Sequence, residues 1–450
     1  MISSQLRSLS AVRQTTSTTL LDAKNLHNFD LNLSKVDDVV AGVLALIERD
    51  YATPADIPFH SRWRHFDGPA PDAKRINALL ASAEWASVDQ KEKVRRIIDL
   101  FVVSVLLDAG AGPDWKFRFS DGTQLGRSEG LALASLDWFK VGGFSANPTS
   151  NPHRVDSSAL KKISPESLEK AFQVSASNPL VGVHGRCSLL TRLADVLEAQ
   201  PRFFHNKENN DYRPGNLVDF VLADSRVAAR SSDGKIEVPV EVLWDVVMDG
   251  LSGIWPATRT QVDGVSLGDV WPSKAMESIM NSSDAAKTGP IPQAAKEKKV
   301  YVMAFHKLSQ WLTYSLMEPL SLLNITFTNM KLMTGLAEYR NGGLFVDMGV
   351  LALKPDALAR GMASALPTAA NIPRFEVFDD AVVEWRALTV ALMDLVGTKV
   401  QTALKMTEDE LPLVKVLEAG TWKLGREVAA KLRPAAKGPP IDIISDGTVF

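Results

Sequence analysis

The sequence has few of the residues that build disulfides or metal centres. It contains one cysteine, Cys187, which excludes an intrachain disulfide framework and favours a reducing compartment. The seven histidines are scattered, and His60 and His65 are not spaced to put two ligands on one helical face. Neither a Gly-rich loop ending in Gly-Lys-Ser/Thr nor a His-Glu-x-x-His motif is present. We therefore expect no metal site and no cofactor.

The sequence also lacks a basic excess and a long hydrophobic run. Its 50 Lys and Arg residues face 53 Asp and Glu residues, a net charge of -3, so we expect no nucleic-acid partner. No stretch approaches the roughly 20 uninterrupted apolar residues that cross a bilayer, and the N-terminus lacks the apolar core of a secretory signal. We expect a cytoplasmic protein without membrane association, and the sequence leaves its oligomeric state open.

Apolar residues recur mostly at helical spacing, which predicts a mainly α protein. The best example is one broad stripe that ends at Gly110 and consists of Val94, Ile97, Ile98, Phe101, Val102 and Val105. Strand signals are short and surround three Asp-Gly turns, in WKFRFSDGTQL, VAARSSDGKIEV and IDIISDGTVF, which predict small β-hairpins. We expect residues 1–30 to be loosely ordered and residues 31–450 to form a single compact helical enzyme domain, with lobes meeting near 141–158 and 281–299.

Charged residues and aromatic rings share one face of the helix expected around Lys307. At 3.6 residues per turn, this face carries Lys307, Gln310, Trp311, Tyr314 and Glu318. A solvated surface seldom has Trp and Tyr between Lys and Gln, whereas the wall of a binding pocket needs both rings and a few polar groups. We interpret this face as a pocket wall.

The stretch TGLAEYRNGGLF places Glu338, Tyr339 and Arg340 between apolar residues. Gly342 and Gly343 then permit a close turn or the close approach of a ligand. Two interpretations remain open: a catalytic carboxylate, or a buried Glu-Arg ion pair that joins two helices.

Further clusters mix charge with aromatic rings. They contain, in chain order, Arg62, Trp63, Arg64 and His65; Trp115; Ser128 and Glu129; and Glu384 and Arg386. For any single tryptophan, packing in the core is the simpler explanation. Ser128 can cap the helix that follows it, with Glu129 in the first turn, and this role needs no ligand.

These clusters belong to longer motifs that resemble a known family. The motifs include IPFHSRWRHF, VVSVLLDAGAGPDW, GRSEGLALAS, FHKLSQWLTYSLMEPL, GLAEYRNGGLFVDMGVL and VVEWRALTVAL. They look like the uracil-catabolism protein family of bacteria and fungi, from about residue 30 to the last residue. The resemblance implies a place in a uracil degradation route that passes through ribosylated intermediates and ends in urea.

A more distant resemblance suggests which residues act. Phe305-His306-Lys307 with Gln310, then Ala337-Glu338-Tyr339-Arg340, then Glu384-Trp385-Arg386-Ala387 are similar to motifs of the queuosine-nucleotide N-glycosidases, in the same order. That family implies a helical architecture like that of DNA glycosylases, with Lys307 and Glu338 as the catalytic pair. Glu338 stands where the family has aspartate, so its carboxylate reaches one methylene further. We expect substrate binding by Arg340, Tyr339, Gln310, Tyr314, Glu384, Arg386, Arg62, Trp63, Arg64, His65, Trp115, Ser128 and Glu129.

We therefore expect an N-glycosidase that hydrolyses ribosylurea, or its 5-phosphate, to urea and the sugar. Breaking a ribosyl C–N bond builds positive charge at the anomeric carbon, and a carboxylate beneath the ring stabilises that charge, orients water or attacks. Lys307, Arg340 and Arg386 are cations suited to a phosphate, so we expect a phosphorylated small-molecule substrate. Hydrolysis of another, modified nucleotide and a non-catalytic nucleotide-binding role are the alternatives.

Overall fold

The computed structural model describes residues 2–16, 22–68, 74–108, 110–112, 114–228, 231–255, 259–281, 298–369 and 371–444. The chain divides into two compact units. The first comprises Met1–His60, Ala257–Gln310 and Met330–Phe450, and the second comprises Ser61–Pro256 and Trp311–Asn329. Of the two lobe boundaries that we predict, residues 141–158 lie inside the second unit. Most of 281–299 lies outside the described residues.

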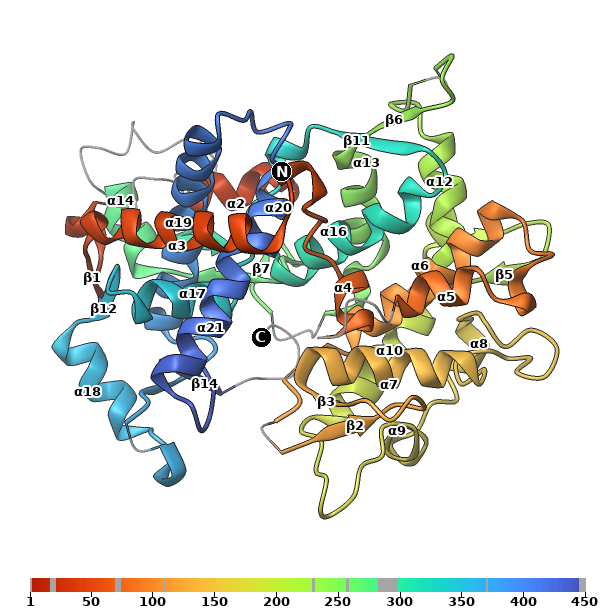
Figure 1. The fold of residues 1–450 in the computed structure, drawn as a ribbon, viewed down its shortest axis with the longest axis horizontal. Helices are drawn as coiled ribbons and strands as arrows, with labels where there is room; N and C mark the ends of the chain where they lie inside the picture. Colours follow the sequence, from red (N-terminus) through yellow and green to blue (C-terminus); the bar gives the residue numbers. More distant parts are fainter. Residues whose placement is uncertain are drawn as a thin grey trace. The chain divides into compact units, whose positions relative to one another are not determined.

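The first unit is mainly helical (Figure 1). Its helices are α1 (Ile2–Leu6), α2 (Leu9–Thr15), α3 (Val36–Asp50), α14 (Lys274–Asn281), α17 (Tyr339–Asp347), α18 (Pro355–Ala363), α19 (Asp380–Leu404), α20 (Leu413–Val416), a π-helical turn η13 (Leu417–Thr421) and α21 (Trp422–Leu432). Its short strands are β1 (Phe29–Leu31), β7 (Gln261–Val262), β8 (Val265–Ser266), β9 (Val270–Pro272), β10 (Val302–Ala304), β12 (Leu351–Leu353), β13 (Arg374–Glu376) and β14 (Asp442–Ile444). Helix α17 packs against both α19 and α21.

The second unit has the same character. Its helices are α4 (Arg62–Asp67), α5 (Arg75–Leu80), α6 (Gln90–Leu106), α7 (Arg127–Lys140), α8 (Ser157–Leu160), α9 (Pro165–Ala171), α10 (Val183–Ala199), α11 (Pro201–Phe204), α12 (Leu217–Ala223), α13 (Val240–Asp245) and the π-helical η8 (Val246–Gly250). Its strands are β2 (Lys116–Arg118), β3 (Gln124–Gly126), β4 (His205–Asn206), β5 (Asp211–Tyr212), β6 (Ile236–Pro239) and β11 (Ile325–Thr328). Helix α16 (Lys307–Ser321) begins in the first unit and continues in the second.

The prediction of a mainly α protein is confirmed, but the three predicted hairpins differ in outcome. Strands β2 and β3 form the first predicted antiparallel hairpin. The turn of the second predicted hairpin is present, since the Ser231 and Ala228 N–H groups donate to the Lys235 and Glu237 carbonyls at 2.8 and 3.2 Å. Strand β6 also pairs in parallel with β11, a strand distant in the chain. The third hairpin stays a prediction: β14 pairs in parallel with β13, and residues 445–450, which would supply the second strand, lie outside the described residues.

Helix α6 shows why helical spacing was a good guide. All six residues of the predicted stripe are buried, and each contributes roughly 1.5–3 kcal/mol by leaving water. Asp89 caps the helix by accepting the Glu92 N–H at 3.0 Å. The helix ends at Leu106, before Gly110.

Two further features of the first unit follow from buried apolar faces. Residues 1–30, for which we expect loose order, contain α1, α2 and the first two residues of β1; Ile2, Leu6, Leu9 and Val12 are buried there. Helix α19 is long and apolar enough to cross a membrane by length and composition alone, but 56% of its most apolar window is buried inside the fold. Such burial is what a core helix shows.

Candidate active site

The segment around Glu338 is the start of helix α17. Glu338 is the N-cap, and its carboxylate accepts the backbone N–H groups of Arg340 and Asn341, both at 2.6 Å. An N-terminal carboxylate satisfies donors that have no partner within the helix and interacts favourably with the helix dipole. In the part of the chain that the structure describes, we find no ion pair between Glu338 and the Arg340 guanidinium. Of the two interpretations of TGLAEYRNGGLF, the Glu-Arg ion pair is therefore wrong, because the helix start engages the carboxylate.

Glu338 and Lys307 interact electrostatically, and no hydrogen bond or ion pair joins them in the described part of the chain. Both residues are partly exposed. Burial raises the pKa of the Glu338 carboxyl group, while the two backbone N–H groups and the cations Lys307 and Arg340 offset part of that rise. The Lys307 ammonium has no hydrogen-bond or ion-pair partner among the described residues. A fixed carboxylate and an unengaged cation, both on partly exposed residues, can act together on a small molecule.

Asp269 and Arg386 hold this pair in place. The fully buried Asp269 carboxylate binds both terminal nitrogens of Arg386 at 2.7 Å and accepts the Lys307 backbone N–H at 2.9 Å. Burial by itself would raise the pKa of Asp269, but Arg386 and these hydrogen bonds lower it to about 2. Arg386 Nε also donates to the Ala337 carbonyl at 3.2 Å, next to Glu338. One guanidinium thus ties the start of α16 to the start of α17.

The two glycines do not form the turn that we predict. Gly342 and Gly343 lie inside α17, and helix packing explains them. A Cβ at Gly342 would lie 2.8 Å from Trp385 Nε1 and from Thr389 Oγ1, so α19 approaches the backbone of α17 too closely for a side chain. A Cβ at Gly343 would lie 2.9 Å from Pro440 Cδ.

Two other predicted substrate-binding residues of this unit have their polar atoms engaged by the protein. Gln310 is fully buried, and its amide donates to Thr334 Oγ1 at 2.8 Å and accepts the Thr334 N–H at 3.3 Å. Glu384, on α19, accepts the backbone N–H groups of His27, Asn28 and Phe29 at 2.9–3.0 Å. Burial raises the pKa of Glu384, and these hydrogen bonds offset it. Both fasten one segment of the unit to another.

The cluster from Arg62 to His65 belongs to the second unit, where it forms helix α4. Arg62 is fully buried: its Nη1 lies 2.8 Å from Asp108 Oδ2, and its Nε donates to Ser104 Oγ at 2.8 Å. Burial lowers the pKa of Arg62, and Asp108 and Glu129 offset that effect. Arg64 pairs with Glu318 at 2.8 Å. Trp63 and His65 are buried, with edge contacts to Phe101 and Trp311.

Tyr339 lies in the first unit at the start of α17, with the Arg340 guanidinium carbon 5.4 Å from its ring centroid. The remaining predicted residues lie in the second unit. Trp115 and Tyr314 are buried, and Trp115 Nε1 donates to the Phe172 carbonyl at 3.0 Å. Ser128 is not a helix cap, because α7 begins one residue earlier and Gly126 is its N-cap; Glu129 lies in the first turn as predicted. Substrate binding by these residues stays a prediction.

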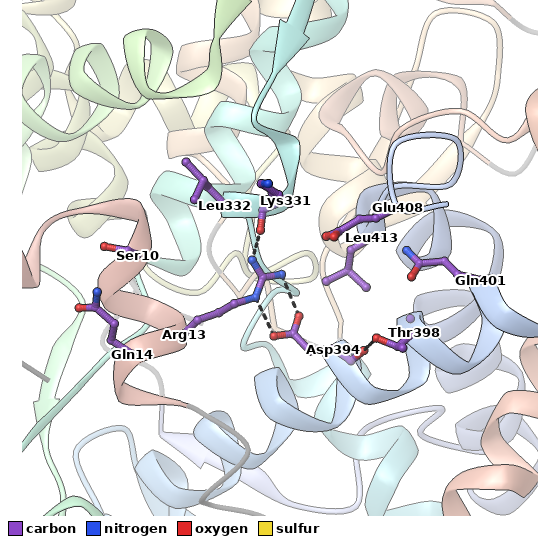
Figure 2. Close-up of a pocket in the computed structure, with 11 residues that line it drawn as sticks. Ser10, Arg13, Gln14, Lys331, Leu332, Asp394, Thr398, Gln401, Glu408 and Leu413 are labelled. Atoms are coloured by element: carbon purple, nitrogen blue, oxygen red, sulfur yellow. Dashed lines mark hydrogen bonds and ion pairs between the residues drawn. The ribbon is translucent and has the colours of Figure 1, made fainter. Parts of the chain in front are cut away.

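A separate cavity of about 490 Å³ lies in the first unit (Figure 2). Arg13 crosses it to Asp394, with Nε–Oδ2 at 2.8 Å and Nη2–Oδ1 at 3.0 Å, and also donates to the Lys331 carbonyl. Lys331, Gln401 and Glu408 line it as well. None of the predicted site residues lines this cavity.

The sequence patterns did not predict a role for two residues of the Glu338 region. Asp269 stands in LGDVW as an acid between apolar residues, a signal that could have marked a buried ion pair. Asn341 follows Arg340 directly, and its side chain is fully buried. Its amide Oδ1 and Nδ2 have no hydrogen-bond partner in the described part of the chain.

These features define a mainly α protein of two units with a polar cluster around Glu338 in the first. The chain belongs to the DUF1688 family, described as "Protein of unknown function (DUF1688)", which matches residues 5–450. It is 40% identical over 462 residues to "Uracil catabolism protein 4" of Lachancea kluyveri, covering 99% of this chain and 98% of that protein. It is 38% identical over 434 residues to "Protein urg3" of Schizosaccharomyces pombe, covering 95% of this chain and 94% of that protein. The resemblance to the uracil-catabolism family is confirmed, and the similarity to queuosine-nucleotide N-glycosidases stays a prediction.

Proposed function

We propose that this protein is an N-glycosidase of uracil catabolism that hydrolyses ribosylurea, or its 5-phosphate, to urea and ribose or ribose 5-phosphate. The name of the Lachancea kluyveri relative supports the pathway. One observation supports the chemistry: backbone donors of α17 fix the carboxylate of Glu338, a partly exposed residue, and the cation of Lys307 lowers the pKa of that carboxylate. A carboxylate held in this way is preorganised for a cationic transition state.

In the proposed reaction, water adds to the anomeric carbon as the C–N bond breaks. The departing nitrogen takes a proton from solvent and leaves as urea, the sugar keeps the water hydroxyl, and the other water proton passes through Glu338 to solvent. Glu338 stabilises the positive charge at the anomeric carbon and accepts the proton of the attacking water. Lys307 and Arg340 supply positive charge for a 5-phosphate.

A substrate panel tests the proposal. Purified protein is incubated with ribosylurea 5-phosphate, ribosylurea, uridine and uridine 5-monophosphate, and urea, uracil and free sugar are measured. We expect urea only from the ribosylurea compounds. Release of uracil would favour the alternative of another nucleotide substrate, and binding without turnover of any compound would favour the non-catalytic alternative.

Lys307→Met is expected to affect the phosphorylated substrate more than the unphosphorylated one. Losing one charge-assisted contact to phosphate costs about 1.5–3 kcal/mol, or roughly 10- to 100-fold in kcat/KM. Steady-state kinetics with ribosylurea and its 5-phosphate provide the comparison. An equal loss with both substrates would assign Lys307 to the sugar or to Glu338 rather than to phosphate.

The rate is expected to fall in acid at a higher pH than an ordinary glutamate would cause. Burial raises the pKa of Glu338 above the usual 4.5, and the reaction needs the ionised carboxylate. As the pH falls through that raised pKa, the carboxylate is protonated and kcat/KM declines. A pH profile of urea release gives the midpoint. A midpoint at or below 4.5 would contradict the assignment of Glu338 as the acting base.

A further inference from the structure

The unpartnered amide of Asn341 is a buried polar group of the first unit that the fold itself does not explain. Its side chain is fully buried, yet neither Oδ1 nor Nδ2 has a hydrogen-bond partner within the described residues. Buried amides are nearly always paired, because leaving one unpaired forfeits the hydrogen bonds that water supplied. Gln310, a buried amide of the same unit, is paired at both of its ends by Thr334.

Asn341 lies beside the carboxylate of the proposed reaction. It lies three residues after Glu338, the N-cap of α17, and its backbone N–H donates to Glu338 Oε1 at 2.6 Å. The adjacent Gly342 packs against the indole nitrogen of Trp385, a second buried donor without a partner in the described structure. The first turn of α17 therefore carries the unpaired amide of Asn341, and α19 adds the unpaired indole N–H of Trp385.

The chemistry of an amide restricts what can satisfy it. Oδ1 accepts and Nδ2 donates, so a ligand that pairs with both must present an acceptor and an N–H donor side by side. Phosphate and carboxylate oxygens only accept. A ureido group presents a carbonyl oxygen next to an N–H and matches the amide edge to edge.

We propose that Asn341 is the specificity-determining residue that binds the ureido leaving group, its Nδ2 donating to the ureido carbonyl and its Oδ1 accepting a ureido N–H. This inference rests on the proposed function and names the part of the substrate that Asn341 recognises. Trp385 Nε1 is the second donor available to the same carbonyl. If Asn341 binds the ureido group, the protein binds ribosylurea more tightly than a sugar that lacks this group.

The test measures binding in the Glu338→Gln protein, in which substrate persists. Isothermal titration calorimetry compares ribosylurea 5-phosphate with ribose 5-phosphate, with and without Asn341→Leu, a substitution of similar size that removes both polar atoms. We expect the ribosylurea compound to bind about 10- to 100-fold more weakly to the leucine variant and ribose 5-phosphate to bind unchanged. Because an unpaired buried amide is replaced by an apolar side chain, the melting temperature should stay the same or rise.

Two outcomes would overturn the inference. Equal weakening of both ligands would assign Asn341 to the sugar or to the shape of the site, and unchanged binding of both would remove it from recognition. Gln310→Leu is the matched control, since it removes a paired buried amide, and we expect its melting temperature to fall. Failure of the proposed function is separately visible. If wild type releases no urea, but Asn341→Leu still weakens binding of the ribosylurea compound, Asn341 recognises the ureido group and the protein is not an N-glycosidase for it.

Discussion

Glu338→Gln is expected to lower kcat/KM for urea release by about 10²- to 10³-fold or more. Glutamine keeps the length of the side chain and one acceptor for the α17 N–H groups, but it removes the negative charge that would face the cationic transition state. Losing one preorganised electrostatic contact typically costs a factor of this size. Activity equal to wild type would refute the proposed mechanism.

The same variant should fold as well as the wild-type protein. Because burial raises the pKa of Glu338, the ionised carboxylate is a cost of folding at any pH above that pKa. At neutral pH we expect the glutamine variant to have an equal or higher free energy of unfolding. Its advantage should shrink as the pH falls through the raised pKa, where wild type becomes neutral. Chemical denaturation at several pH values checks this.

Glu408→Gln is the control for the change of charge. Glu408 is exposed and lines the separate 490 Å³ cavity rather than the Glu338 region. We expect its activity to match wild type. A loss of activity in this variant with none in Glu338→Gln would move the reaction to the cavity of Figure 2.

Asp269→Asn is expected to lower the free energy of unfolding by about 3–5 kcal/mol. The variant leaves Arg386 charged, fully buried and without its bidentate partner, and breaking a buried pair in this way is strongly destabilising. It also weakens the hydrogen bond that Asp269 accepts from the Lys307 backbone N–H, so activity should fall in the protein that remains folded. Urea denaturation at pH 7 gives the first quantity, and urea-release kinetics of the folded fraction give the second.

The pH dependence of this loss has a defined sign. The pKa of Asp269 is lowered from 3.8 to about 2. At pH values above 3.8, the ionised carboxylate therefore contributes about 2 kcal/mol to the free energy of unfolding. That contribution disappears as the pH falls from 3.8 to about 2, and the difference between wild type and Asp269→Asn should narrow there.

Asp394→Asn is the matched control for burial. It breaks another bidentate carboxylate–arginine pair of the same unit, but the side chains of Arg13 and Asp394 remain 32% and 26% exposed. Water stabilises the charge left behind, so we expect a loss of about 1 kcal/mol or less. Equal losses in the two variants would show that burial does not determine the contribution of Asp269.

Helical periodicity was enough to predict the core helices, because an apolar stripe at 3.6-residue spacing has few other ways to leave water. The stripe of α6 is buried as expected. Strand pairing was harder to predict: β6 and β14 pair with segments far away in the chain, and no local pattern identifies such partners. Ser128 shows a similar limit: as a cap it would start α7 at Glu129, but the helix starts two residues earlier, at Arg127.

The sequence by itself determined the mainly α class, the family and the residue types that could act on a ribosyl bond. Only the tertiary structure decided what each charged residue does. Arg340 and Arg386 look alike in the sequence. Arg386 binds the buried Asp269, which lies 117 residues away in the chain, whereas the Glu338 carboxylate binds backbone N–H groups of α17 and not the Arg340 guanidinium. The reason is that a charge acts through its neighbours in space, and folding selects those neighbours from distant parts of the chain.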